Sequence, residues 1–456
     1  MRRLSASLLV LAVASTCAAA EPAPPPVARL FFQDHDARAL KWADVTEAKD
    51  GKLSLGAVTD VAGFPKLDAK KQSLVQMREC KGRLLVGVRD DDEGGFASGW
   101  VMVATGAKYA DHGDHGHWSY KKPPQVIASK LDKEQGNPAH LYLYDDHFYL
   151  ANDRKDGYTR FDPDEFSVTP SGTAAAGTPR FYPGGGNHIT LATVGNKVGY
   201  GSWIDGGGPN KGRVDVTPLG DKPAIKYSFA LPTGVIHGAA ACAGKVFFAP
   251  ADGICWVSAD LDTKKSKDDV KVNHIPLGKA DDKPLRTGAF ATHANHVLCV
   301  TGKGADGRLV VLDASAADPK LVAVPLNGKD GHKPLTPVVV AAKGGKNPLA
   351  FVFHDRDAES KIDDLCDVIA LDPNGDGKFA DAKVLKTIPV GKSAVSGHSG
   401  HHDFGTDADG RLAFFTNPGD GTVTALDVKT LTVRATFKVG GKPTALAVVG
   451  GSDHDD

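Results

Sequence analysis

The sequence lacks the features that assign a chain to several common functional classes. Its 54 basic residues nearly balance its 55 acidic ones, so bulk electrostatic binding to nucleic acid or to an anionic membrane is not expected. Beyond residue 20, no apolar stretch approaches the ~18 residues of a membrane-spanning helix, so no membrane insertion is expected. A Gly-rich phosphate loop, a G-x-S-x-G nucleophile elbow and a C-x-x-C-H haem site are also missing. These absences indicate no catalytic residues and no organic cofactor.

Cysteine is scarce, with six residues in the chain. Cys17 lies in the first 20 residues, and none of the other five stands in a C-x-x-C pair, so neither a thiolate zinc site nor a redox motif is indicated. An odd number leaves at least one free thiol, and the pairing of the rest stays open. Apolar strand-like runs around four of the five favour buried, unreactive side chains. The five are Cys80, Cys242, Cys255, Cys299 and Cys366.

The first 20 residues have the pattern of a secretion signal. Arg2 and Arg3 precede a short apolar run, and Ala18-Ala19-Ala20 fits a small-residue cleavage site. We therefore predict a signal peptide over residues 1–20 and a periplasmic location, with lipidation at Cys17 as the weaker alternative. Residues 21–27 form a Pro-rich linker and residues 451–456 an acidic tail.

Short alternating β-runs separated by Gly and Asp turns fill the rest of the chain. Four such runs recur at periods of roughly 40–60 residues, which is typical of a β-propeller, and no long amphipathic helical pattern competes. We count eight units between residues 28 and 450, with a seven-blade ring as the alternative because the outer strand of the third unit, near Phe181, is weak. The last strand, residues 443–449, is predicted to pair with residues 28–33 as the inner strand of blade one and so close the ring. The second strands are expected to begin near Ala28, Arg83, His147, Lys197, Lys245, His296, Pro348 and Arg411.

The most conspicuous motif is Asp111-His112-Gly113-Asp114-His115-Gly116-His117. Imidazole nitrogen binds Zn²⁺ well, and carboxylate oxygen can complete the coordination shell. The motif lies in a long connection, residues 108–123, and such loops are often functional. It predicts a mobile metal site made by the three histidines with Asp111 or Asp114; the alternative is a solvated polar loop.

A second set of histidines emerges when the blades are aligned. His140, His188, His237 and His402 each lie seven to nine residues before a second strand, at the start of the inner strand of a blade. Inner strands line the channel, so these side chains are expected to converge at one of its ends. They predict a preformed Zn²⁺ site, in which His398 or His401 could substitute for a member.

A third candidate, Asp372-Pro-Asn374-Gly-Asp376-Gly377, matches the start of a calcium loop. Lys383 stands where the bidentate Glu is required, so a plain Asp/Asn/Gly turn is an equally good interpretation.

The histidine motifs resemble those of AztD-type periplasmic zinc metallochaperones. The resemblance rests on the 111–117 loop and on the sequences Asn137-Pro-Ala-His140, Asn187-His188, Val235-Ile-His237-Gly238 and Gly397-His398-Ser-Gly-His401-His402. The last 30 residues also resemble the broader YVTN/YncE-like propellers. The resemblance implies a non-enzymatic β-propeller that binds Zn²⁺ and passes it to the solute-binding protein of a zinc ABC importer. One departure affects the ligand count: Ala239 follows Gly238, where the family tends to carry an acidic residue.

Two other functions remain open from the sequence. A ring of histidines at a propeller hub also resembles nitrous oxide reductase, so a copper or zinc metalloenzyme is one alternative, although no segment for a cupredoxin domain follows. A metal-free protein-interaction propeller is the other. In each case we expect a monomer.

Overall fold

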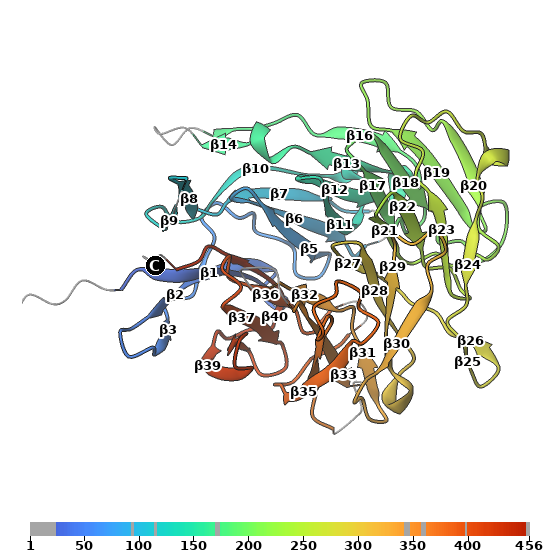
Figure 1. Ribbon diagram of the computed structural model, residues 1–456. Coiled ribbons are helices and arrows are strands. Elements are labelled where there is room, and N and C mark those ends of the chain that lie inside the picture. The colour runs from blue at the N-terminus through green and yellow to red at the C-terminus, as the bar shows by residue number, and fades with distance from the viewer. Residues whose placement is uncertain are drawn as a thin grey trace, which may run out of the picture.

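The computed structural model describes residues 24–92, 95–113, 116–168, 174–341, 347–356, 362–396 and 399–452. These residues form eight antiparallel sheets of four or five strands that surround a common centre (Figure 1). The chain is therefore an eight-bladed β-propeller, as predicted, and the seven-blade alternative is wrong. The predicted signal peptide lies outside the described residues.

Each blade runs from an inner strand at the channel to an outer strand at the rim, and inner strands of neighbouring blades contact one another. Blade one comprises β40 (Pro443–Val449), β1 (Pro26–Asp34), β2 (Ala39–Glu47) and β3 (Leu53–Leu55), with β4 (Thr59–Asp60) also paired to β2. Blade two comprises β5 (Gln72–Cys80), β6 (Arg83–Asp90), β7 (Ser98–Ala104) and β10 (Gln125–Asp132). Blade three comprises β11 (Pro138–Tyr144), β12 (His147–Asn152), β13 (Gly157–Phe161) and β16 (Arg180–Pro183), and blade four comprises β17 (Leu191–Val194), β18 (Val198–Ser202), β19 (Arg213–Pro218) and β20 (Tyr227–Ala230).

Blades five to eight follow the same order. Blade five comprises β21 (Ala239–Cys242), β22 (Lys245–Phe248), β23 (Ile254–Ser258) and β24 (Asn273–Ile275), and blade six comprises β27 (Ala291–His293), β28 (His296–Thr301), β29 (Arg308–Asp313) and β30 (Leu321–Pro325). In blade seven, β31 (His332–Pro334) and β32 (Val338–Val340) both pair with β33 (Leu349–Arg356), which is followed by β34 (Leu365–Ala370) and β35 (Lys383–Pro389). Blade eight comprises β36 (Phe404–Thr406), β37 (Leu412–Asn417), β38 (Thr422–Asp427) and β39 (Thr432–Lys438). Every second strand begins within two residues of its predicted start.

Short elements lie in the connections between the blade strands. Three two-stranded ribbons and five 3-10 helices occur in the described part of the chain: β8 (Lys108–Asp111) with β9 (Gly116–Ser119), β14 (Ser167–Val168) with β15 (Ala174–Ala175), β25 (Lys279–Ala280) with β26 (Lys283–Pro284), η1 (Lys133–Gln135), η2 (Asp153–Lys155), η3 (Pro163–Glu165), η4 (Lys267–Asp269) and η5 (Gly304–Asp306). Among these residues, no helix has the length and apolar character needed to cross a membrane.

The middle strands of the blades carry the core. Eight of the nine residues of β1 are buried, whereas β39 at the rim buries only Phe437. Middle strands are covered on both faces by the adjacent blades, so their sequences are continuous apolar runs rather than alternating ones. Leu30 and Phe32 of β1, for example, pack with Phe414 and Val423 of blade eight. All five described cysteines are buried free thiols within this core, whereas the sequence predicted burial for four of them and left the pairing open.

The ring closes by pairing the two ends of the described chain, also as predicted. β40 is antiparallel to β1, with Leu30 opposite Val448 and Phe31 opposite Ala447. Figure 1 shows the last strands lying beside the first.

Arg29 of β1 is buried and makes a bidentate ion pair with Asp44, at 2.7 and 2.9 Å, while also donating to the Thr105 carbonyl of blade two. A buried guanidinium with this many partners is stabilised and links the closing blade to its neighbour.

Candidate metal centre

Three of the predicted histidines come together at one end of the channel. His140 is the third residue of β11, and His188 and His237 stand shortly before β17 and β21. These are the inner strands of three consecutive blades, and β17 contacts both β11 and β21. Equivalent positions on adjacent inner strands therefore place three imidazoles in one volume.

The geometry of this three-histidine cluster suits a small cation. One ring nitrogen from each of His140, His188 and His237 lies within 4.8 Å of the other two, and all three side chains are half-buried. The Nε2 atoms of His140 and His188 are 2.9 Å apart. Tetrahedral Zn²⁺ with bonds of ~2.0–2.1 Å holds its ligand atoms about 3.3 Å apart, so only a small opening of this pair is needed.

Neighbouring groups orient two of the rings. Nδ1 of His188 lies 3.3 Å from Oδ2 of Asp153, and Nδ1 of His237 lies 3.1 Å from the carbonyl oxygen of Gly288. Both partners accept hydrogen bonds, so Nδ1 carries the proton and Nε2 is the nitrogen that can bind a metal. Acceptors behind metal-binding histidines have this effect in known sites.

Asp153 was not found from the sequence. It begins η2, directly after the second strand of blade three, and is buried. Its Oδ1 accepts a hydrogen bond from the Ile189 amide at 3.1 Å, and its Oδ2 lies 3.3 Å from Nη1 of Arg89. A carboxylate that follows the second strand of one blade, at the end where the next inner strand begins, is the signal that could have revealed it.

The backbone before each histidine has an unusual conformation. Asn137, Asn187 and Val235 have φ angles of 54°, 64° and 58°, in the left-handed region. Asn tolerates this region, but a β-branched residue rarely adopts it. Val235 is held there by a hydrogen bond from its amide to the Asp205 carbonyl at 3.3 Å and by one from Arg286 Nη2 to its own carbonyl at 3.1 Å. These turns re-aim the chain just before the inner strands and direct the histidines inward.

His402 occupies a different part of the ring. It precedes β36 of blade eight, so it shares the end of the channel with the three-histidine cluster but lies three blades beyond blade five. Its Nδ1 is 2.6 Å from the Thr416 carbonyl, and its Nε2 is 3.3 Å from Oδ2 of Asp364 and 3.8 Å from Oδ1 of Asp355. The expectation of one site made by all four histidines is therefore corrected: equivalent register fixes the end of the ring, not the side.

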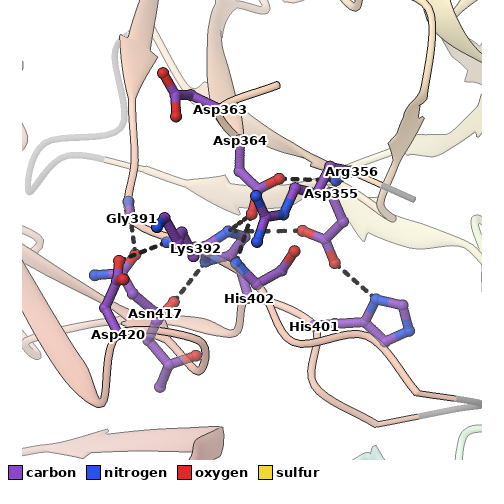
Figure 2. A network of polar contacts seen from close by, with 12 residues as sticks. Asp355, Arg356, Asp363, Asp364, Gly391, Lys392, His401, His402, Asn417 and Asp420 are labelled. Atoms are coloured by element: carbon purple, nitrogen blue, oxygen red, sulfur yellow. Dashed lines mark hydrogen bonds and ion pairs between the residues drawn. The ribbon is translucent and has the colours of Figure 1, made fainter. Parts of the chain in front are cut away.

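His401 joins this second group, which we call the His402 cluster: His401, His402, Asp355 and Asp364 (Figure 2). Nδ1 of His401 lies 2.7 Å from Oδ2 of Asp355. Burial lowers the pKa of His402, but the hydrogen bond with Asp364 and the charge of Asp355 outweigh it and raise the pKa above its ordinary value. Burial opposes ionisation of Asp364, yet the hydrogen bonds from His402 and from the Ser393 amide lower its pKa to about 2. His398 lies outside the described residues.

Two ends of the 111–117 motif belong to the β8–β9 ribbon: Asp111 ends β8, and Gly116 and His117 begin β9. Ala110 pairs with His117 and Asp111 with Gly116, and the rings of His112 and His117 are 5.6 Å apart. Asp111 accepts a hydrogen bond from the Gly113 amide at 2.8 Å. Asp114 and His115 lie outside the described residues, so metal binding at this ribbon stays a prediction. Figure 1 shows the ribbon beside β1 and the C-terminal end.

In the calcium-like segment, residues 372–377, side-chain oxygens bind backbone amides of the segment itself. The two carboxylate oxygens of Asp372 accept hydrogen bonds from the Asp376 and Gly377 amides, at 3.0 and 2.9 Å. The side-chain oxygen of Asn374 accepts from Asp376 at 2.9 Å. Side chains that bond backbone amides in this way are those of an ordinary Asx-type turn, so this geometry favours the turn interpretation.

The fold and the three-histidine cluster define the class: an eight-bladed β-propeller with a candidate metal centre at one end of its channel. No protein-family model matches the chain, and no curated protein matches it either.

Solved structures give the particular likeness. The structure of apo AztD from Citrobacter koseri has a TM-score of 0.61 and 16% identity, covering 94% of this chain and 100% of that chain. A second AztD structure from the same organism also gives 0.61 and 16%, with 95% and 100% coverage. The dihydro-heme d1 dehydrogenase NirN, in complex with DHE, has a TM-score of 0.51 and 14% identity, covering 94% of this chain and 76% of that chain. The resemblance to AztD inferred from the sequence is thus confirmed for the fold.

Proposed function

We propose that this chain is a periplasmic zinc-binding metallochaperone that delivers Zn²⁺ to the solute-binding protein of a zinc ABC importer, and that it is not an enzyme. The observation that carries the proposal is the three-histidine cluster, whose ligand atoms lie within 4.8 Å of one another. The fold likeness to AztD and the histidine motifs support it.

The chemistry of the cluster fits a carrier. Three imidazoles can hold Zn²⁺ while leaving the fourth tetrahedral position for an incoming ligand. A donor from a partner protein can occupy that position before a histidine leaves, so the ion never has to pass through bulk water. The half-buried side chains of His140, His188 and His237 keep this position within reach of a partner. In this scheme His112, His115 and His117 of the 111–117 motif capture Zn²⁺ first and hand it to the cluster.

Zinc titration tests the proposal. The metal-free chain is titrated with Zn²⁺ against a competing chelator, alongside a variant with His140, His188 and His237 changed to Gln. His274→Gln is the matched control, because His274 is an exposed histidine on an outer strand. We expect the triple variant to lose one tightly bound equivalent and the control to keep it. Wild-type binding should weaken as the pH falls below ~6.5, because imidazole binds metal only when neutral.

A transfer assay then tests the role. The zinc-loaded chain is mixed with the purified solute-binding protein of a zinc importer, and the metal content of each protein is measured after separation. Transfer that is faster than release to free chelator supports a metallochaperone. Zinc binding no tighter than micromolar in the wild type contradicts the proposal and leaves an interaction propeller. Bound copper with a visible absorbance band would favour the metalloenzyme instead.

A further inference from the structure

We propose that the His402 cluster is a second binding site for a divalent transition-metal cation, held by Nε2 of His402, Oδ1 of Asp355 and Oδ2 of Asp364. It lies between blades seven and eight, apart from the three-histidine cluster. The inference does not rest on the proposed function, because its residues, blades and coordinating atoms are all different.

The first step in the argument is the tautomer of His402. Its Nδ1 lies 2.6 Å from the carbonyl oxygen of Thr416, which can only accept a hydrogen bond. Nδ1 must therefore carry a proton, and the other nitrogen, Nε2, faces the two carboxylates. This is the arrangement by which a backbone carbonyl prepares a histidine to bind metal through Nε2.

The second step is that Nε2 faces more acceptors than one proton can satisfy. Oδ2 of Asp364 lies 3.3 Å away and Oδ1 of Asp355 lies 3.8 Å away. Carboxylate oxygens accept hydrogen bonds and do not donate them when ionised. A protonated His402 has a single N–H at this nitrogen, which can point to Asp364 and leaves Asp355 too distant for a hydrogen bond.

The third step is the unpartnered oxygen that results. Oδ1 of Asp355 accepts no hydrogen bond although Asp355 is only 2% exposed. A buried carboxylate oxygen without a partner is costly, and a bound ion is one of the arrangements that satisfies such an atom in a native protein. A cation between the three atoms would satisfy this oxygen and Nε2 at the same time.

The distances agree with a coordination shell. Ligand atoms around tetrahedral Zn²⁺ are about 3.3 Å apart, which falls at the shorter of the two separations from Nε2. The other oxygen of each carboxylate is already held by a hydrogen bond, so the two ligand oxygens are kept near these positions. Oδ1 of Asp364 accepts from the Arg356 amide at 2.8 Å, and Oδ2 of Asp355 pairs with Nδ1 of His401. One imidazole and two carboxylates suit Zn²⁺, Mn²⁺ or Fe²⁺, with water in the remaining positions.

His401 then acts as a positioning residue. Its ring holds the far oxygen of Asp355, so the near oxygen stays turned toward His402 (Figure 2). Its side chain is 37% exposed, whereas those of His402 and Asp364 are fully buried. His401 therefore stands between the buried cluster and solvent, on the side from which a cation can enter.

The test uses Zn²⁺ as the probe in two variants of the full chain. Asp355→Asn keeps the shape of the side chain but removes the charge and one possible ligand. Asp363→Asn is the matched control, since it removes the same charge next to Asp364, and the exposed Asp363 side chain points away from the cluster in Figure 2. Both are made in a background with His112, His115, His117, His140, His188 and His237 changed to Gln, so that neither the 111–117 motif nor the three-histidine cluster contributes to zinc binding. We expect one equivalent of zinc in the background protein, a loss of at least ~10-fold in its affinity with Asp355→Asn, and no change with Asp363→Asn.

Anomalous diffraction at the zinc edge locates the ion independently of any variant. Wild-type crystals soaked in Zn²⁺ should show a peak bounded by Nε2 of His402, Oδ1 of Asp355 and Oδ2 of Asp364. Equal affinities of the two variants, or no peak at this position, would overturn the inference and leave an internal ion pair only. If Asp355→Asn fails to fold, the anomalous map of the wild type decides the question.

Discussion

The three-histidine cluster and the His402 cluster contain similar histidine–carboxylate pairs, but the histidine rings are oriented differently. In both, a histidine at the start of an inner strand meets a carboxylate from the end of the second strand in the preceding blade: Asp153 for His188, and Asp355 for His402. The difference is which ring nitrogen faces the acid. His188 turns Nδ1 to the carboxylate and offers Nε2 to other imidazoles, whereas His402 turns Nδ1 to a carbonyl and Nε2 to two carboxylates.

This difference in orientation has consequences for exchange. Three half-buried imidazoles bring no negative charge to a bound cation. Such a group therefore releases the cation readily to a competing ligand. A buried histidine between two carboxylates holds positive charge tightly, whether that charge is a proton or a metal ion. The first cluster is suited to transfer and the second to retention. Four variants, taken from the largest expected effect to the smallest, can break or sharpen this contrast.

The largest effect is expected on stability, from His402→Ala in metal-free buffer. Removing the imidazole leaves Asp364 and Asp355 buried without a cation, and breaking a buried pair in this way typically costs about 3–5 kcal/mol. His188→Ala is the comparison and should cost no more than about 1 kcal/mol, because its ring is half-buried and its partner Asp153 keeps Arg89. Urea unfolding of the two variants measures both values. Similar losses would remove the distinction between a retaining and an exchanging cluster.

The next effect is on zinc affinity, where the order of the two variants reverses. His188→Ala removes one of three imidazole ligands and should weaken binding at the three-histidine cluster by more than the ~100-fold that loss of an outer-shell partner can cause. His402→Ala should leave that affinity unchanged. Chelator competition on both proteins supplies the numbers, and an equal loss in the two would mean that all four histidines share one ion.

Asp407 shows how this fold treats a buried carboxylate that has no histidine. It follows β36, only 2% exposed, and accepts hydrogen bonds from the Arg411 and Leu412 amides. Burial outweighs those bonds and raises its pKa to about 6, whereas the pKa of Asp364 is about 2. The folded protein thus binds this proton more tightly than the unfolded chain does, so the stabilisation is complete at low pH and is lost as the pH rises through about 6.

Asp407→Asn removes this titration. Between pH 4 and 7 the wild type should lose about 2 kcal/mol of stability that the variant does not lose. The exposed residue Asp381, changed to Asn, is the control and should behave as the wild type does. Free energies of unfolding at the two pH values give the comparison; parallel pH profiles of wild type and Asp407→Asn would contradict it.

The smallest effect is expected from Asp153→Asn, which changes the orientation of the ligand His188 but leaves the number of metal ligands unchanged. Loss of an outer-shell carboxylate typically reduces metal affinity by ~10–100-fold. Asp156→Asn is a suitable control, since Asp156 lies at the end of the same short 3-10 helix and Asn accepts its left-handed conformation. Zinc titration of both variants decides whether Asp153 positions His188 or serves only the local fold.

The sequence predicted the fold well because a propeller is a local repeat. The runs at Arg83, His147, Lys245 and His296 begin second strands as expected, since each run is continuously apolar and bounded by turn residues. The ring closure by residues 443–449 followed from the need to cover an open sheet edge.

The candidate site was predictable only in part. Strand register told which histidines lie at one end of the channel, but the distance from His402 to the others depends on how blades are distributed around the ring. The orienting partners Asp153, Gly288 and Asp355 were not predictable, because each lies far from its histidine in sequence and in a neighbouring blade. Only the packing of one blade on the next brings them together.

The closure of the ring also sets a condition on how the protein folds. One edge of β1 pairs with β2, which follows it directly, but the other edge pairs with β40, the last strand of the described chain. Until β40 pairs, this edge is open and the apolar residues of β1 lack the cover that blade eight supplies. Pairing over such a sequence separation is slow, because the loop must close before any contact forms. We therefore expect refolding to be limited by the docking of residues 443–449, with the intervening blades already formed.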